Sequence, residues 1–257
     1  MCGISGYFLK NNSQTKFKPD INKSLELISH RGPDGKDIYI SKDERIALAH
    51  SRLSIIDVSE NGRQPMHSFD NRLTIIFNGE IYNYKELKSF LVKKGYKKWR
   101  GNSDTEVVLK MFLYSFENGI KLDNILRRLK GIFAIALWDS VEEELFLIRD
   151  ALGVKPLYLS EMEIGLSFAS EIKSILPLIN KTTHNEDIVL NKNIDPDNIN
   201  RYLTFLWCPG KGTPSKIFRK VGPGEYLKIK NGMVEKKSKW YFLPTYNKKV
   251  KKLNKDN

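Results

Sequence analysis

Residues 131–139, GIFAIALWD, and residues 144–150, ELFLIRD, are the two apolar runs from which the fold class can be argued. Both are short and rich in Ile, Leu and Phe, with the apolar or alternating pattern that is typical of β-strands. Segments of the same kind occur at residues 3–9, 37–41, 45–56 and 72–77. The sequence therefore predicts a protein with many short strands.

Helical patterns lie between these strands. In three segments the apolar side chains recur three and four positions apart, as they do in a helix buried on one face. These segments are residues 20–31, 83–95 and 103–119. The third begins at a capping residue, Ser103 or Asp104, and ends at Gly119. Because the strands cluster instead of alternating strictly with helices, the pattern predicts an α+β fold of packed layers rather than a doubly wound parallel sheet.

The character of the chain changes near residue 180. Residues 180–198 are polar and are expected to form a loop, and residues 197–207 resemble a helix. Residues 221–242 predict a hairpin that turns at Asn231-Gly232. Residues 245–257 hold too few apolar side chains to form a core and are expected to be a linker or tail.

The composition is that of a folded, soluble protein. The 257 residues are 40% hydrophobic, and no stretch approaches the roughly 18 apolar residues that span a bilayer, so no membrane association is expected. The N-terminus lacks the basic and apolar regions of a secretory signal. Cys2 and Cys208 give no disulfide framework, which predicts a reducing, cytoplasmic location.

The net charge of +13 raises the question of nucleic-acid binding, because lysines neutralise phosphates. Much of the excess lies in residues 234–242 and 245–257, and the basic, aromatic-interleaved motif of an RNA-recognition sheet is missing. A solvated, lysine-rich surface is therefore the preferred interpretation, and no nucleic-acid partner is expected.

Cys2 follows directly after the initiator methionine. If Met1 is removed, this residue carries both a thiol and a free α-amino group, whose reference pKa of about 8 is close enough to neutral to accept the thiol proton. Nucleophile and general base would then belong to one residue. An inert cysteine at position 2 explains the same pattern.

Asn78-Gly79 stands between two apolar runs in LTIIFNGEIYNY, residues 73–84. On pattern alone this pair favours a hairpin turn, since both residues tolerate positive φ. The functional alternative is an oxyanion hole, in which a side-chain amide and a glycine N–H point into one space.

Arg52 and Asp104 are candidates for binding an amino acid. The guanidinium of Arg52 suits a carboxylate, and Asp104 could bind an ammonium group, so that together they would hold an α-amino acid zwitterion. Each also has an ordinary explanation, Arg52 as a surface charge and Asp104 as a helix cap. His30 and His50 lack the spacing of metal ligands and are interpreted as structural; no metal site is predicted, and residues 208–216 fail the spacing of a P-loop.

Nine blocks of sequence, taken in order, resemble one family. They are MCGISGYF, HRGPDG, AHSRLSIID, QPM, FNGEIYNY, GNSDTEVVL, GIFAIALWD, RDALGVKPLYL and FASEIKSIL. This ordered set closely resembles the glutaminase domain of glutamine-hydrolysing asparagine synthetases, a class II glutamine amidotransferase. The match is dense through residue 178 and weaker through residues 221–242.

The resemblance implies a fold and a set of site residues. The fold is a four-layer αββα sandwich of the N-terminal nucleophile hydrolase type, over residues 1–243. Cys2 matches the catalytic nucleophile, exposed after Met1 is removed, and Asn78 and Gly79 match the oxyanion donors. The remaining matches are to glutamine-binding residues: Arg52 for the α-carboxylate, the pocket-lining segment Leu53, Ser54, Ile55 and Ile56, and Glu80 and Asp104 for the α-amino group.

The resemblance also implies hydrolysis of L-glutamine to glutamate and ammonia, with no metal or cofactor in this half-reaction. Family members continue into a synthetase domain with an SGG-x-DS signature, which does not occur here, so ATP and Mg are expected only in that domain. Residues 244–257 are then a linker toward a synthetase domain in the same full-length chain, or the chain is a separate subunit. Aspartate is the expected ammonia acceptor.

Two alternatives to this function stay open, together with one expectation about assembly. The first alternative is a stand-alone subunit that supplies ammonia for amidation of another carboxylate, such as a polysaccharide sugar. The second is a catalytically silent module that senses glutamine. A homodimer is also expected as one possible assembly.

Overall fold

Two antiparallel sheets form the centre of the molecule. The computed structural model describes residues 1–11, 18–179 and 193–244. The first sheet has the strand order β10-β8-β9-β1-β3-β2 and the second the order β12-β11-β7-β6-β5-β4. The strands of the first are β1 (Gly3–Leu9), β2 (Gly35–Ile40), β3 (Ile46–Arg52), β8 (Tyr158–Met162), β9 (Gly165–Ala169) and β10 (Arg219–Lys220). Those of the second are β4 (Met66–His67), β5 (Leu73–Ile81), β6 (Gly131–Asp139), β7 (Glu144–Arg149), β11 (Glu225–Lys230) and β12 (Met233–Lys239).

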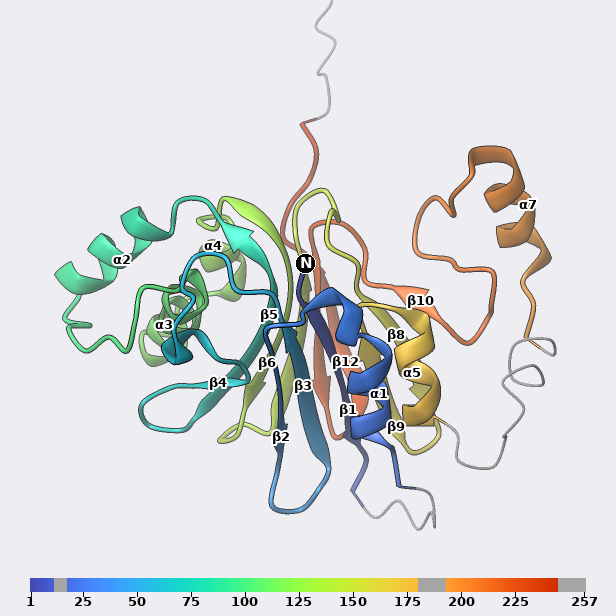
Figure 1. Ribbon diagram of the computed structural model, residues 1–257. Coiled ribbons are helices and arrows are strands. Elements are labelled where there is room, and N and C mark those ends of the chain that lie inside the picture. Colours follow the sequence, from blue (N-terminus) through green and yellow to red (C-terminus); the bar gives the residue numbers. More distant parts are fainter. Residues whose placement is uncertain (12–17, 180–192, 245–257) are drawn as a thin grey trace, which may run out of the picture.

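Helices cover the outer face of each sheet (Figure 1). The first sheet carries α1 (Ile21–Leu27) and α5 (Ile172–Ile179), and the second carries α2 (Tyr84–Lys93), α3 (Asp104–Glu117) and α4 (Leu122–Leu126). Helix α7 (Pro196–Phe205) stands apart from the sandwich, and short 3-10 turns occur at Ser29–Arg31 and Glu60–Gly62. The order of layers is therefore helix, sheet, sheet, helix, and the predicted αββα sandwich is confirmed.

The alternation of side chains along β6 shows why two core layers form. Phe133, Ile135 and Leu137 pack toward the helices of the second sheet, whereas Ala134 and Ala136 pack between the two sheets. A strand that is apolar on both faces needs cover on both, because successive side chains point to opposite sides of a sheet. The apolar run GIFAIALWD thus requires a layer on either side of β6.

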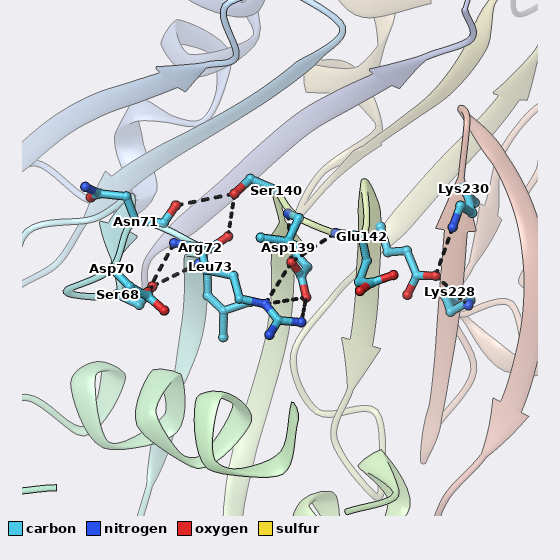
Figure 2. Close-up of polar contacts among 12 residues, drawn as sticks. Ser68, Asp70, Asn71, Arg72, Leu73, Asp139, Ser140, Glu142, Lys228 and Lys230 are labelled. Carbon is cyan, nitrogen blue, oxygen red and sulfur yellow. Dashed lines mark hydrogen bonds and ion pairs between the residues drawn. The ribbon is translucent and has the colours of Figure 1, made fainter. Parts of the chain in front are cut away.

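Side-chain contacts fix the register where β5 begins. Figure 2 shows Arg72 reaching the carboxylate of Asp139, with Nε 3.1 Å from each oxygen and Nη2 2.7 Å from Oδ2. Asp139 is buried and pairs across the sheet with Leu73. Farther along, Glu144 on β7 binds Lys228 of β11 at 2.7 Å. These charged contacts hold neighbouring strands of the second sheet in register at the edge where β5 begins.

The sequence located most elements correctly. Ser103 caps α3, as expected for one of the two candidates, by accepting a hydrogen bond from the N–H of Glu106 at 3.2 Å. The hairpin at Asn231-Gly232 is present between β11 and β12. The hairpin of β8 and β9 was not predicted, and neither were helices α4 and α5 or the two-residue strands β4 and β10. The expected loop at 180–198 lies outside the described residues as far as residue 192, and its last residues belong to the start of α7. The expected linker at 245–257 lies outside the described residues.

No helix within the described part of the chain is long and apolar enough to cross a membrane. The two cysteines are both free.

Candidate active site

Cys2 lies where β1 begins, against the end of β3. Its Sγ accepts a hydrogen bond from the N–H of Leu53 at 3.3 Å and lies 3.6 Å from the Leu53 carbonyl oxygen. The Cys2 carbonyl accepts a hydrogen bond from Arg31 Nε at 3.0 Å, and Arg31 in turn pairs with Glu171 at 2.8 Å. The cysteine is therefore held at its backbone carbonyl and at its sulfur.

The environment of the Cys2 thiol opposes its ionisation. Burial raises the thiol pKa above its ordinary value, and the nearby carboxylate of Asp104 adds to this effect. The hydrogen bond from Leu53, the chain's N-terminal amine and the charge of Arg52 act in the opposite direction. Because burial dominates, this thiol needs a base to become a nucleophile.

Arg52 is the last residue of β3 and is buried, so its interpretation as a surface charge is wrong. Its guanidinium donates to the carbonyl of Asp57, which turns the loop after β3 around the arginine. The N–H of Ser54 donates to Asp34 Oδ2 at 2.7 Å, and the N–H of Asp34 donates to the Arg52 carbonyl at 3.0 Å. The HRGPDG segment thus fixes the loop that follows Arg52.

Asn78 lies in the middle of β5, paired with Ala134 of β6, and Gly79 is paired with Phe133. The hairpin-turn interpretation of this pair is therefore wrong. Glycine is required here for a different reason: a Cβ at position 79 would lie 2.7 Å from the Cα of Phe133. The Asn78 side chain is 1% exposed, and neither its Oδ1 nor its Nδ2 has a hydrogen-bond partner within the structure.

The N–H of Gly79 points away from β6. Along β5 the N–H of Phe77 donates to Gln64 Oε1 at 2.6 Å, and the N–H of Ile81 donates to Asp104 Oδ2 at 3.0 Å. Both acceptors lie on the side opposite β6. Since alternate residues of a strand direct their N–H groups to the same side, the N–H of Gly79 lies between these two contacts.

Asp104 opens helix α3 but does not cap it, since Ser103 does. Its Oδ2 accepts from Ile81 and its Oδ1 from the N–H of Thr105 at 2.9 Å. Burial raises the pKa of Asp104 to about 6, with a further contribution from the charge of Glu80, although the two hydrogen bonds oppose it. Two carboxylates thus face one space, an arrangement that favours binding of a cation.

The structure brings all the predicted site residues to one pocket of about 90 Å³. The lining includes Cys2, Arg52, Leu53, Ser54, Ile55, Ile56, Asn78, Gly79, Glu80 and Asp104. Met1 also lines the pocket, so the encoded N-terminal residue occupies space beside the thiol. Their roles in catalysis and binding stay predictions.

Three residues at or beside the pocket were not among the predicted site residues, and a fourth, His50, was interpreted as structural. Gln64 bridges Phe77 and Thr105, Arg31 holds the Cys2 carbonyl, and Lys155 lines the pocket. His50, entirely buried, contacts the Phe77 carbonyl through Nε2 at 3.2 Å, and burial lowers its pKa to about 4. All four stand in sequence blocks that carry the family resemblance, yet no local signal indicates which side chains reach the pocket.

His30 binds Glu171 at 3.0 Å. Across the described ranges, no group of three or more His, Cys, Asp and Glu side chains is arranged to hold a metal ion.

Comparison with known proteins identifies the family. The family model described as "Glutamine amidotransferase domain" matches residues 1–241. Asparagine synthetase [glutamine-hydrolyzing] 1 of Bacillus subtilis (strain 168) is 37% identical over 232 residues, which cover 90% of this chain and 34% of the relative. Asparagine synthetase [glutamine-hydrolyzing] 2 of the same organism is 39% identical over 178 residues, covering 68% of this chain and 22% of the relative.

A solved structure shows the same fold. Glutamine phosphoribosylpyrophosphate amidotransferase from B. subtilis, complexed with ADP and GMP, superposes with a TM-score of 0.65 at 21% identity, over 94% of this chain and 50% of that chain. The chain spans about a third of the length of the first of the synthetase relatives. Since the family model covers nearly the whole chain, the protein belongs to the class II glutamine amidotransferase family, as the nine sequence blocks predicted.

Proposed function

We propose that this chain hydrolyses L-glutamine to glutamate and ammonia, and supplies the ammonia to an ATP-dependent synthetase that amidates aspartate. The observation that carries the first part is the Asn78 side chain, which is buried in the pocket without a hydrogen-bond partner. Buried amides are normally satisfied, so one that is left open beside a nucleophile is suited to a group that arrives with the substrate.

Binding of glutamine uses the charged residues of the pocket. The Arg52 guanidinium binds the α-carboxylate, and Glu80 and Asp104 bind the α-ammonium group. The Leu53–Ile56 loop lines the pocket wall. This arrangement directs the side-chain amide of glutamine toward Cys2.

The reaction begins once Met1 has been removed. The thiol proton of Cys2 passes to the α-amine of the same residue, and the thiolate attacks the carbonyl carbon of the glutamine side chain. The oxyanion accepts hydrogen bonds from Asn78 Nδ2 and the N–H of Gly79. As the C–N bond breaks, the α-ammonium group returns its proton to the departing nitrogen, which leaves as ammonia. Water then hydrolyses the thioester to glutamate and restores the thiol.

The ammonia acceptor and the partner follow from the names of the relatives, which include the word asparagine synthetase. We place the synthetase domain in the same full-length chain or on a separate subunit, and assign ATP and Mg to it alone. The complete set of nucleophile, oxyanion donors and zwitterion-binding residues favours catalysis over the silent sensing module. The proposal includes a cytoplasmic location, where thiols stay reduced.

The test is glutamate release by protein whose N-terminal residue is shown by mass spectrometry to be Cys2. We expect turnover by the processed protein, none by Cys2→Ala, and none by chain that retains Met1, because its α-amine is held in a peptide bond. Cys208→Ala, which changes the other free thiol, is the matched control and should retain activity. Processed protein that releases no glutamate, either alone or with its synthetase domain, would contradict the proposal.

A further inference from the structure

Lys155 is a buried cation at the nucleophile whose presence the reaction above does not explain. Its side chain lines the pocket, is 8% exposed, and places Nζ 3.0 Å from the Sδ of Met1. Within the part of the chain that the structure describes, no carboxylate forms an ion pair with it. An ammonium group left without a counter-charge in a pocket acts on the groups around it, since few water molecules screen its field.

The turn before Lys155 is built to hold it in place. Its backbone N–H donates to Asp150 Oδ2 at 2.9 Å, and its carbonyl accepts from Arg149 Nε at 2.7 Å. Arg149 also donates to the carbonyls of Gly153 and Val221, both at 2.7 Å. Asp150 and Arg149 are themselves buried, so the RDALGVKPL segment is a rigid support that delivers one lysine to the pocket.

Removal of Met1 leaves Lys155 beside the new N-terminus. Nζ lies 3.0 Å from the Met1 Sδ, and five bonds join that sulfur to the Cys2 nitrogen, so Nζ lies no more than roughly 9 Å from that nitrogen. In the processed protein the same nitrogen is the α-amine. A positive charge at this range favours the neutral form of an amine and the ionised form of a thiol.

Other charged groups face Cys2, and bound glutamine engages most of them. Arg31 is already paired with Glu171. Arg52 binds the substrate carboxylate, and Glu80 and Asp104 bind its ammonium group. The remaining acidic group of the pocket is Asp57, whose carboxylate accepts hydrogen bonds from Ser59 and Asn102. Lys155 is thus the one cation of the described pocket lining that the substrate does not neutralise.

We propose that Lys155 is a positioning residue that acts through its charge, keeping the Cys2 α-amine unprotonated at neutral pH and favouring the thiolate. This inference rests on the proposed glutaminase function and adds to it a residue that influences the protonation of the general base. A base works best when its pKa lies near the working pH, and the reference value of about 8 for an α-amine leaves much of it protonated at pH 7. A neighbouring cation lowers that value without taking part in the proton transfer.

The test compares processed Lys155→Met, Lys155→Gln and Lys155→Arg with wild type by the pH dependence of kcat/KM for glutamine hydrolysis. The acidic limb reports protonation of the α-amine. In both neutral variants it should move to higher pH by about half to one unit, an effect on the order of that expected for one partly screened charge. Lys155→Arg should keep the limb of the wild type, and Lys228→Met, which removes a lysine from the ion pairs of β11, should not move it.

A second measurement does not depend on turnover. The rate at which iodoacetamide alkylates Cys2 in the processed protein, followed against pH, should show the same upward shift in the two neutral variants, because the thiolate is the reacting form. An unmoved midpoint and an unmoved acidic limb in variants that melt as the wild type does would overturn the role of Lys155. If the alkylation midpoint does not move and glutaminase activity is normal, the role of Lys155 is contradicted and the proposed function is not. If the alkylation midpoint shifts but the processed protein releases no glutamate, the proposed function alone is contradicted. If neither neutral variant folds, a Lys155→Arg limb displaced from that of the wild type overturns the proposal.

Discussion

At the scale of single residues, Asn78 is expected to contribute to catalysis but little to the stability of the fold. Its amide is buried with both polar atoms unsatisfied, so the folded state bears the cost of removing it from water without the compensation of a hydrogen bond. We predict that Asn78→Ala changes the free energy of unfolding by less than about 1 kcal/mol while lowering kcat by about 10²–10³-fold. Urea unfolding and steady-state kinetics on the same preparation test this. A large loss of stability would show that the amide has a partner in the folded protein.

Asp104 should also cost stability when it is ionised. Its pKa is raised to about 6 in the folded protein, so the fold holds a proton that the unfolded chain, with a carboxyl pKa near 4, releases. Stability from this group is therefore present below pH about 4 and lost as the pH rises through about 6. We predict that Asp104→Asn gains roughly 1–3 kcal/mol over the wild type at pH 7.5 relative to pH 4.5.

The same variant should bind glutamine poorly, since it removes one of two charges facing the ammonium group. Unfolding in urea at the two pH values gives the stability difference, and KM gives the second effect. Thr105→Ser, at the neighbouring position, is the control. A stability difference between Asp104→Asn and wild type that does not change with pH would contradict the prediction.

The residues of the site were predictable because each stands in a sequence block with a recognisable neighbourhood. What the pattern could not show is how distant segments meet. Lys155 reaches Met1 only because a turn held by Asp150 lies beside the start of β1. Gln64 was overlooked for the same reason, since it contacts Phe77, which belongs to a different part of the chain. The pattern also gave no sign that His50, interpreted as structural, contacts Phe77.

At the scale of elements, the pairing of β5 with β6 determines the site. Asn-Gly between apolar runs normally marks a turn, and the sequence offers no sign that β6 will lie alongside. Only the long register from Leu73–Asp139 to Ile81–Gly131 shows that β5 continues through the pair. The missed strands have a similar cause: β4 and β10 are two residues long, and their pairing is set by neighbours and not by their own composition.

The Arg72–Asp139 contact should contribute strongly to this pairing. We predict that Arg72→Ala lowers the free energy of unfolding by about 2–4 kcal/mol, because it leaves a buried carboxylate without its cation. Arg63→Ala is a matched control, since Arg63 pairs with Glu60 on the surface and its loss should cost less than about 1 kcal/mol. Urea unfolding measures both. Equal effects of the two substitutions would show that the buried pair does not secure β5.

At the scale of the whole molecule, a contact of His50 between the two sheets makes the stability of the fold depend on pH. It lies on β3 of the first sheet, and its Nε2 donates to the Phe77 carbonyl on β5 of the second. Its pKa is lowered to about 4, so the unfolded chain takes up a proton at a pH where the folded protein does not. Stability from this group is complete above pH about 6.5 and is lost as the pH falls toward 4.

We therefore predict that the wild type loses roughly 2–3 kcal/mol more than His50→Gln between pH 7 and pH 4. Glutamine keeps an N–H donor for the Phe77 carbonyl and does not titrate. Chemical unfolding of the two proteins across this range measures the difference. Parallel pH curves would show that His50 contributes nothing to the acid sensitivity of the fold.

The residue pattern predicted packed layers and the family resemblance implied their four-layer order, yet neither showed its consequence for chemistry. Cys2 directly precedes β1 of the first sheet, whereas Asn78 and Gly79 belong to the second, and side chains such as Phe8, Ala134 and Leu147 fill the space between. The reacting sulfur and the groups that bind the oxyanion are thus positioned by different sheets. A loosened state could keep every strand and still lose the reaction, because catalytic geometry tolerates little displacement. Turnover of glutamine would then depend on the packing of the two sheets against each other. On warming, it should be lost before circular dichroism records any loss of secondary structure.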